Sequence, residues 1–192
     1  MQPPTVPGIA AALYGAWRLL RFDAAGVQVF ETGETAFWQS FTAALIALPG
    51  YAILVALHLS GDAPAADWAS TGLLHALSYV MSWTAFPLAA YYLAARLNAA
   101  EKWVGFVIAL NWSKVLQMAI YLPLVMIAET GIAGQGGGAF LAFVGFVAVL
   151  VYQWFVTKSA LGIAGPAAAG LTFVDLIIGL FITTMTDAAL AG

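Results

Sequence analysis

Five long apolar segments follow one another along the chain, and short stretches rich in Gly, Pro and polar residues separate them. A helix needs about 20 mostly apolar residues to cross about 30 Å of hydrocarbon, and each segment meets that length. The predicted spans are residues 37–59, 68–97, 103–128, 138–163 and 166–190. Short connections favour antiparallel packing of successive helices. The pattern therefore predicts an all-α integral membrane protein, whose residues 37–192 form a bundle of five transmembrane helices.

A shorter apolar stretch precedes the spans. Residues 9–22 are apolar but contain Arg18 and Arg21, so the stretch is too short and too charged to cross a bilayer. Trp17 suits the headgroup level, where an aromatic ring with a polar group is favoured. We interpret residues 1–36 as a cytoplasmic and interfacial segment, with an amphipathic helix that lies on the membrane surface.

The composition agrees with an integral membrane protein and excludes some kinds of binding partner. The chain has 192 residues, of which 63% are hydrophobic and 8% charged, whereas a soluble domain carries about 25% charged residues. The net charge is −3 and the basic residues form no cluster, so we expect no nucleic-acid partner. The chain has no Cys and two His, so we expect no metal and no cofactor. The expected partner is the lipid bilayer.

Basic residues outside the spans gather on one side of the predicted bundle. This side carries Arg18, Arg21, Arg96, Lys102 and Lys158. The loops on the other side, residues 60–67 and 129–137, and the C-terminus carry no Lys or Arg. Cytoplasmic loops of membrane proteins are enriched in basic residues. We therefore expect a multi-pass protein of the inner cell membrane with a cytoplasmic N-terminus and a C-terminus outside.

Two ionisable residues fall well inside the spans, where a charge costs roughly 2.5–3.5 kcal/mol on insertion scales. At a rise of about 1.5 Å per residue, Lys114 lies about 16 Å beyond Trp103, and Asp175 lies about 13–14 Å beyond Pro166. Gln153 of the fourth span lies about 15 Å from the end of that span that is on the same side of the membrane as Trp103 and Pro166. These depths predict one polar layer near the midplane, in which Lys114 donates to the Asp175 carboxylate and Gln153 satisfies what remains.

Further polar residues recur every three or four positions on three spans, which places them on one face of each helix. They are Asn111, Gln117 and Tyr121 beside Lys114, Thr172 and Thr183 beside Asp175, and His75, Ser78 and Ser82 in the second span. For His75 two interpretations stay open, a hydrogen-bonded helix residue and a proton relay.

Two functions compete for the polar layer. Intramembrane ionisable groups commonly mark an ion, proton or solute pathway. Alternatively, Lys114 and Asp175 form a structural ion pair, and the protein is a non-catalytic accessory or assembly subunit of a larger membrane complex. We favour transport or permeation of a proton, ion or small solute, because an accessory subunit needs no polar face on three spans. Self-association and partners in a membrane complex both stay open.

The sequence contains no residue set that indicates catalysis. The G-x-S-x-G, H-E-x-x-H and phosphate-loop motifs are absent. Ser113 and Lys114 are adjacent, so they point about 100° apart on a helix and make a poor nucleophile–base pair. We therefore expect no enzyme activity, and an enzyme acting on lipid is the weakest hypothesis.

Overall fold

The computed structural model describes residues 3–61, 67–130 and 134–191, and within these ranges all regular structure is helical. The elements are α1 (Val6–Leu20), η1 (Ala24–Val29), α2 (Glu34–Ser40), α3 (Thr42–Gly61), α4 (Trp68–Arg96), η2 (Ala100–Lys102), α5 (Trp103–Glu129), α6 (Gly134–Leu161) and α7 (Gly165–Ala191). The predicted all-α membrane bundle is confirmed. Parts of the two loops without basic residues, 62–66 and 131–133, lie outside the described residues.

Five helical stretches are long and apolar enough to cross a membrane, and the protein is therefore membrane-embedded. They are Glu34–Leu59, Trp68–Arg96, Ala100–Glu129, Gly136–Leu161 and Gly165–Ala191. Each agrees within a few residues with a predicted span. The first span begins earlier than predicted because the short helix α2 leads directly into α3.

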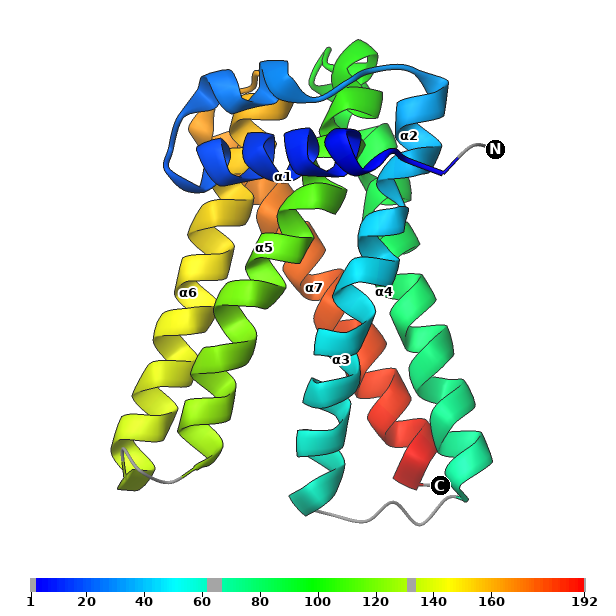
Figure 1. The fold of residues 1–192 in the computed structure, drawn as a ribbon, viewed down its shortest axis with the longest axis vertical. Helices are drawn as coiled ribbons and strands as arrows, with labels where there is room; N and C mark the ends of the chain where they lie inside the picture. Colours follow the sequence, from blue (N-terminus) through cyan, green and yellow to red (C-terminus); the bar gives the residue numbers. More distant parts are fainter. Residues whose placement is uncertain (1–2, 62–66, 131–133, 192) are drawn as a thin grey trace.

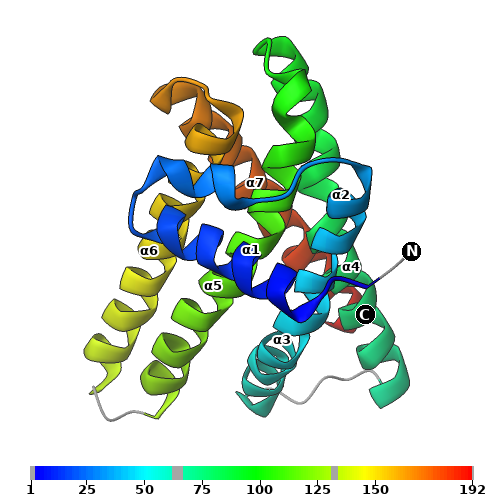
Figure 2. The same cartoon turned by 45° about the horizontal axis from the view of Figure 1, so that its top comes forward.

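The α1 helix lies across one end of the bundle, over the ends of the long helices (Figures 1 and 2). Thr5 caps its first turn by accepting a hydrogen bond from the Gly8 N–H at 3.2 Å. One face is buried against the rest of the protein and contains Ala16 and Leu19, whereas Trp17 stays 48% exposed. The predicted amphipathic helix is thus present, and its position at the membrane surface remains a prediction.

The η1 turn packs directly on α1. A Cβ atom on Gly26 would lie 2.7 Å from the Gly15 carbonyl oxygen, so this close crossing requires glycine. Arg18 Nε donates to Asp23 Oδ2 at 2.7 Å, which lowers the pKa of the Asp23 carboxyl group. The second carboxylate oxygen of Asp23 accepts from the Ala25 N–H at 3.0 Å and starts η1. The segment after α1 is therefore held to the bundle end.

The long helices form two groups that separate toward the end opposite α1 (Figure 1). One group consists of α5 and α6, which pack along each other. The other contains α3, α4 and α7, with α4 packed on α7. Near α1 the two groups meet in a dense core, in which residues 106–113 of α5 are all buried. We call this the closed end and the opposite one the open end.

Candidate functional site

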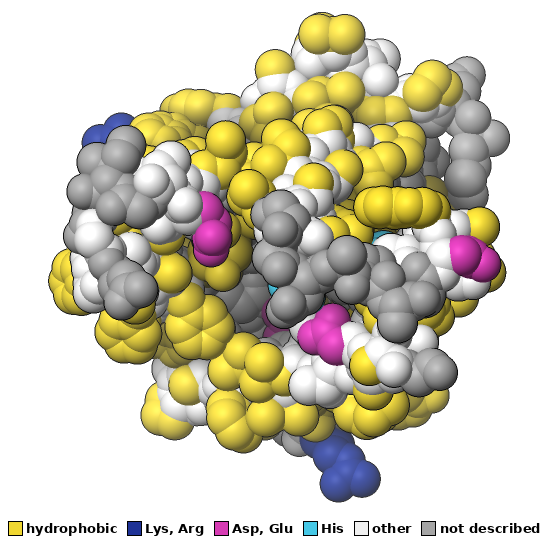
Figure 3. Space-filling model, turned by 90° about the horizontal axis from the view of Figure 1, so that it is seen from below, with side chains coloured by type: hydrophobic (Ala, Val, Ile, Leu, Met, Phe, Trp, Pro, Cys, Tyr) yellow, Lys and Arg dark blue, Asp and Glu magenta, His cyan; other side chains and the backbone are white. Residues whose placement is uncertain are grey.

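Two adjoining cavities lie between the helix groups. The deep cavity has a volume of about 400 Å³ and is lined by Lys114 and by residues of α3 to α6. The mouth cavity has a volume of about 520 Å³, lies toward the open end and is lined by residues of α3, α4, α5 and α7. Tyr51, Ser82 and Tyr121 line both cavities, so the two adjoin. Viewed from the open end, the molecule is hollowed near its centre, among acidic and histidine side chains (Figure 3).

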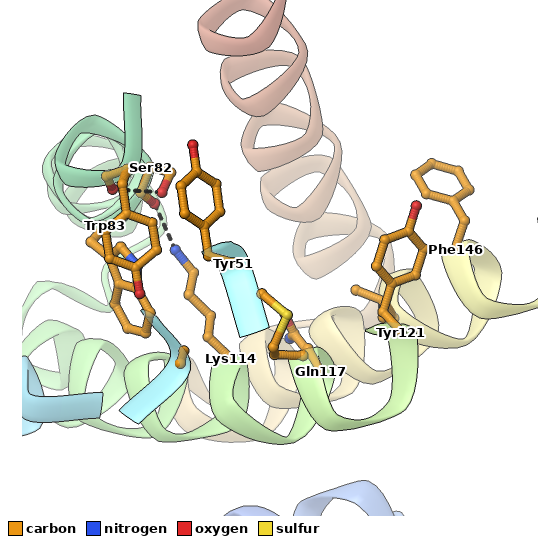
Figure 4. A pocket seen from close by; sticks show the side chains of 11 residues that line it. Tyr51, Ser82, Trp83, Lys114, Gln117, Tyr121 and Phe146 are labelled. Atoms are coloured by element: carbon orange, nitrogen blue, oxygen red, sulfur yellow. Dashed lines mark hydrogen bonds between the residues drawn. The ribbon is translucent and has the colours of Figure 1, made fainter. Parts of the chain in front are cut away.

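The Lys114 side chain reaches from α5 to α4 along the wall of the deep cavity (Figure 4). Its ammonium group donates a hydrogen bond to the backbone carbonyl of Ser82 at 2.8 Å. The nitrogen also lies 5.1 Å from the centre of the Trp83 ring, whose electron-rich face attracts a cation. In the next turn of α4, Pro87 has no N–H to donate to the Trp83 carbonyl, which interrupts the helix ladder. Both contacts of Lys114 stabilise a positive charge inside the bundle.

A chain of hydrogen bonds connects three helices at the level of Lys114. Gln117 Nε2 on α5 donates to Gln153 Oε1 on α6 at 2.7 Å. Gln153 Nε2 then donates to Asp175 Oδ2 on α7 at 3.2 Å. The amide of Gln153 thus uses both its acceptor and its donor between helices. The structure brings Gln153 and Asp175 together as the polar layer predicted.

The expected direct ion pair between Lys114 and Asp175 is not formed. Ion pairs within 4.0 Å among the described residues are Arg18–Asp23 and His58–Asp187. Lys114 points to α4, whereas Asp175 is held on α7 by an α6 side chain. Equal depth along the helices was therefore insufficient for contact, because the two side chains point to different neighbours.

The predicted polar stripes divide between the cavities and the core. Gln117, Tyr121 and Ser82 line the deep cavity, whereas His75, Ser78 and Thr183 line the mouth cavity. Four predicted residues line neither cavity, and Gln153 and Asp175 are two of them. Asn111 is fully buried and donates to Ser40 Oγ on α2 at 2.9 Å. Thr172 is buried and donates to the Ala168 carbonyl of its own helix at 3.0 Å.

The mouth cavity contains several titratable side chains. Nε2 of His58 lies 3.9 Å from Oδ1 of Asp187, and Glu129 lines the same cavity. Nε2 of His75 is buried and has no hydrogen-bond partner among the described residues. A search of the described part of the chain finds no group of three or more His, Asp or Glu side chains that could hold a metal ion. These groups surround the route from the open end to Lys114.

Several cavity residues were not predicted, because their polar groups belong to aromatic side chains or to helix ends. Tyr51 donates from its hydroxyl to the His75 carbonyl at 3.2 Å and lines both cavities. Its phenol midway along an apolar span was the available signal. For Trp83, nothing in the sequence distinguishes an indole ring that contacts a lysine from one that only packs in the core. Glu129 and Asp187 look like ordinary interfacial acids until the helices are assembled.

The closed end is sealed by packing. Tyr152 is buried on α6, and its hydroxyl donates to the Ala16 carbonyl of α1 at 2.8 Å. Phe86 and Phe106 are also buried, with their ring centres 6.1 Å apart. The mouth cavity therefore lies toward one end of the bundle, and a packed core lies toward the other.

Fold and site together define a class, a membrane-embedded bundle of five long helices with a cavity that leads to a lysine inside the bundle. Comparison with models of protein families, with curated proteins and with solved structures finds no match. Function is therefore argued from the cavity and its side chains.

Proposed function

We propose that the protein transports a proton, ion or small solute across the cell membrane through the two joined cavities. The observation that carries this proposal is that the two cavities adjoin and reach from the open end to Lys114, well inside the third span. Charged side chains at such depth are costly and commonly belong to transport pathways. The acids and histidines of the mouth cavity supply groups that exchange protons along the same route.

In the proposed transport cycle, this geometry is the state that is open at one end and packed at the other. Lys114 connects α5 to α4, and the glutamine chain connects α5 and α6 to Asp175 on α7. Protonation of Asp175, or a ligand on Lys114, would change these contacts between helices. The prolines inside α3, α4 and α5 each remove one backbone hydrogen bond, which would let these helices bend in such a cycle.

Flux into liposomes tests the proposal. Purified protein is reconstituted with an entrapped pH-sensitive dye for protons and with radioactive or fluorescent tracers for ions and small solutes. We expect flux above that of empty liposomes, and a change of about tenfold or more for Lys114→Met and Asp175→Asn, which remove charge-assisted contacts. Flux equal to that of empty liposomes for every tracer would contradict the proposal.

Lys158→Met is the matched control for the flux experiment. Lys158 also lies over an indole ring, with its nitrogen 5.3 Å from the centre of Trp154, but it is exposed and outside the cavities. This variant removes one lysine and one cation–π contact without touching the proposed pathway. Its flux should equal that of the unmodified protein.

The accessory-subunit alternative is favoured by one observation, that the same polar bonds tie four helices together. Buried polar contacts of this kind also serve to fix helix packing. In that case the native complex obtained after mild extraction contains a foreign subunit at fixed stoichiometry. Lys114→Met would then lower thermal stability and leave flux at the background of empty liposomes throughout.

A further inference from the structure

The deep cavity has two chemically different parts. Its walls are aromatic and aliphatic, with Tyr79 and Trp83 from α4, Met118 from α5, and Phe146 and Val149 from α6. Its cation is the Lys114 ammonium, which Figure 4 shows beside Tyr51 and across the cavity from Tyr121 and Phe146. An apolar pocket with a few convergent polar groups, at a volume of 300–1,000 Å³, is typical of a small-molecule site, and about 400 Å³ lies within that range.

The Lys114 ammonium has unused hydrogen-bonding capacity. It has three N–H donors, and among the described residues its hydrogen bond is the one to the Ser82 carbonyl. No carboxylate among the described residues lies within 4.0 Å of it. A positive charge in an apolar surrounding is best stabilised by an anion at hydrogen-bond distance. Lys114 therefore has no anionic partner at hydrogen-bond distance among the described residues, and a bound anion would supply one.

The surrounding acids limit the charge of that anion. Asp175 interacts electrostatically with Lys114, and Glu129 and Asp187 line the adjoining mouth cavity. A second negative charge on the ligand would meet these carboxylates without a second cation to balance it, since Lys114 is the one Lys or Arg among the described residues that line either cavity. The balance favours a singly charged carboxylate over a phosphate.

The apolar wall reaches the surface of the bundle. Phe146 lines the cavity and remains 38% exposed, on a helix long and apolar enough to span the membrane. A ligand whose carboxylate meets Lys114 therefore has an apolar path for its chain along α6, toward the lipid. A small hydrophilic anion would make no apolar contact with this part of the cavity wall.

We propose that the deep cavity binds an amphiphilic monocarboxylate of the fatty-acid type, with its carboxylate on Lys114 and its hydrocarbon chain along Met118, Phe146 and Val149. This inference rests on the proposed function and names the class of molecule that the pathway takes. It concerns binding, which is measured without any flux.

Trp83 supplies an optical probe of the site, because it lines the deep cavity and lies 5.1 Å from the Lys114 nitrogen. The protein is placed in nanodiscs of uncharged phosphatidylcholine and titrated with 2-bromoundecanoate, whose bromine lies next to the carboxylate and quenches indole fluorescence on contact. The same titration is run with its methyl ester, and undecyl phosphate, which has no bromine, is added as a competitor that restores the fluorescence when it displaces the acid. We expect saturable quenching by the acid, loss of part of that quenching in Trp83→Phe, and binding about tenfold or more weaker for the ester.

Variants assign the anion to one side chain. Lys114→Met should weaken binding of the acid about tenfold or more, Lys114→Arg should retain most of it, and Lys158→Met should leave it unchanged. Because Lys114→Met alters a buried contact, its melting temperature is measured beside the titration. The comparison of acid with ester uses the unmodified protein and decides the question even where this variant fails to fold.

Three results would overturn the inference. Equal binding of acid and ester would show that the site recognises the chain alone. Tighter binding of undecyl phosphate than of the carboxylate would contradict the preference for a singly charged ligand. Non-saturating quenching that Trp83→Phe leaves unaltered would mean partition into lipid only. Flux without carboxylate binding would contradict the proposed ligand class and agree with the proposed transport function. Saturable, Lys114-dependent binding without flux would support the binding site and contradict the transport function.

Discussion

At the scale of single residues, Lys114 and Asp175 take their hydrogen-bond partners from other helices. Lys114 uses a backbone carbonyl and an indole ring of α4, and Asp175 uses the amide of Gln153. An amide is well suited to this central position, because one group accepts from Gln117 while it donates to a carboxylate. Removal of Gln153 should therefore leave a partly buried carboxylate without its donor, whereas removal of Gln117 should not.

Comparison of Gln153→Leu with Gln117→Leu tests this assignment. Loss of the Gln153 amide is expected to reduce stability by about 1–3 kcal/mol, the cost of leaving a buried acceptor without its partner. Gln117→Leu keeps the donor of Asp175 and should cost less. The measurement is the melting temperature of both variants in one detergent. Equal destabilisation, or a larger effect of Gln117→Leu, would contradict the central role of Gln153.

At the scale of elements, the amphipathic helix α1 acts as the cover of the closed end. Its buried face contains small residues, and Gly15 lets η1 approach the backbone closely. The Tyr152 hydroxyl attaches α1 to α6 by its bond to the Ala16 carbonyl. An opening of this end in a transport cycle would have to break or bend this attachment.

Loss of the Tyr152 hydroxyl should loosen α1. The protein has no Cys, so a single introduced thiol gives an unambiguous probe. Leu19→Cys places it at a fully buried position of α1, and Ala10→Cys places it at an exposed one. We expect Tyr152→Phe to raise the rate of maleimide labelling at position 19 several-fold, since a buried hydrogen bond contributes about 1 kcal/mol. The rate at position 10 should stay the same, and an unchanged rate at position 19 would refute the attachment.

At the scale of the whole molecule, the asymmetry of the two ends determines what the cavity meets. The closed end contains α1 and the basic residues Arg18, Arg96 and Lys102, while the mouth cavity at the open end contains Glu129 and Asp187. Since basic residues stay in the cytoplasm, we propose that the cavity opens to the outside of the cell. A ligand would then reach Lys114 from the outer side or from the lipid.

Reporter fusions test this orientation. Alkaline phosphatase, which folds only outside the cytoplasm, should be active when fused after residue 192, and a fluorescent protein that folds only in the cytoplasm should be dark there. The same two reporters fused before residue 1 should give the opposite result. A fluorescent C-terminal fusion would reverse the proposed direction of the cavity.

Span positions and depths were predictable from the sequence because they depend on distance along one helix. Apolar length sets where a helix can cross the bilayer, and a constant rise per residue sets how deep a side chain lies. For this reason the five spans, the amphipathic α1 and the common level of Gln153 and Asp175 all follow from the order of residues.

The partners of those side chains were decided by the tertiary structure. Contacts depend on which face of each helix meets which neighbour, and the packing of several helices at once sets that rotation. This is why Lys114 lies against Ser82 and Trp83 instead of Asp175, and why Asn111 faces α2 instead of the cavity. The cavity that joins Tyr51 to Lys114 exists only because two helix groups pack at one end and separate at the other.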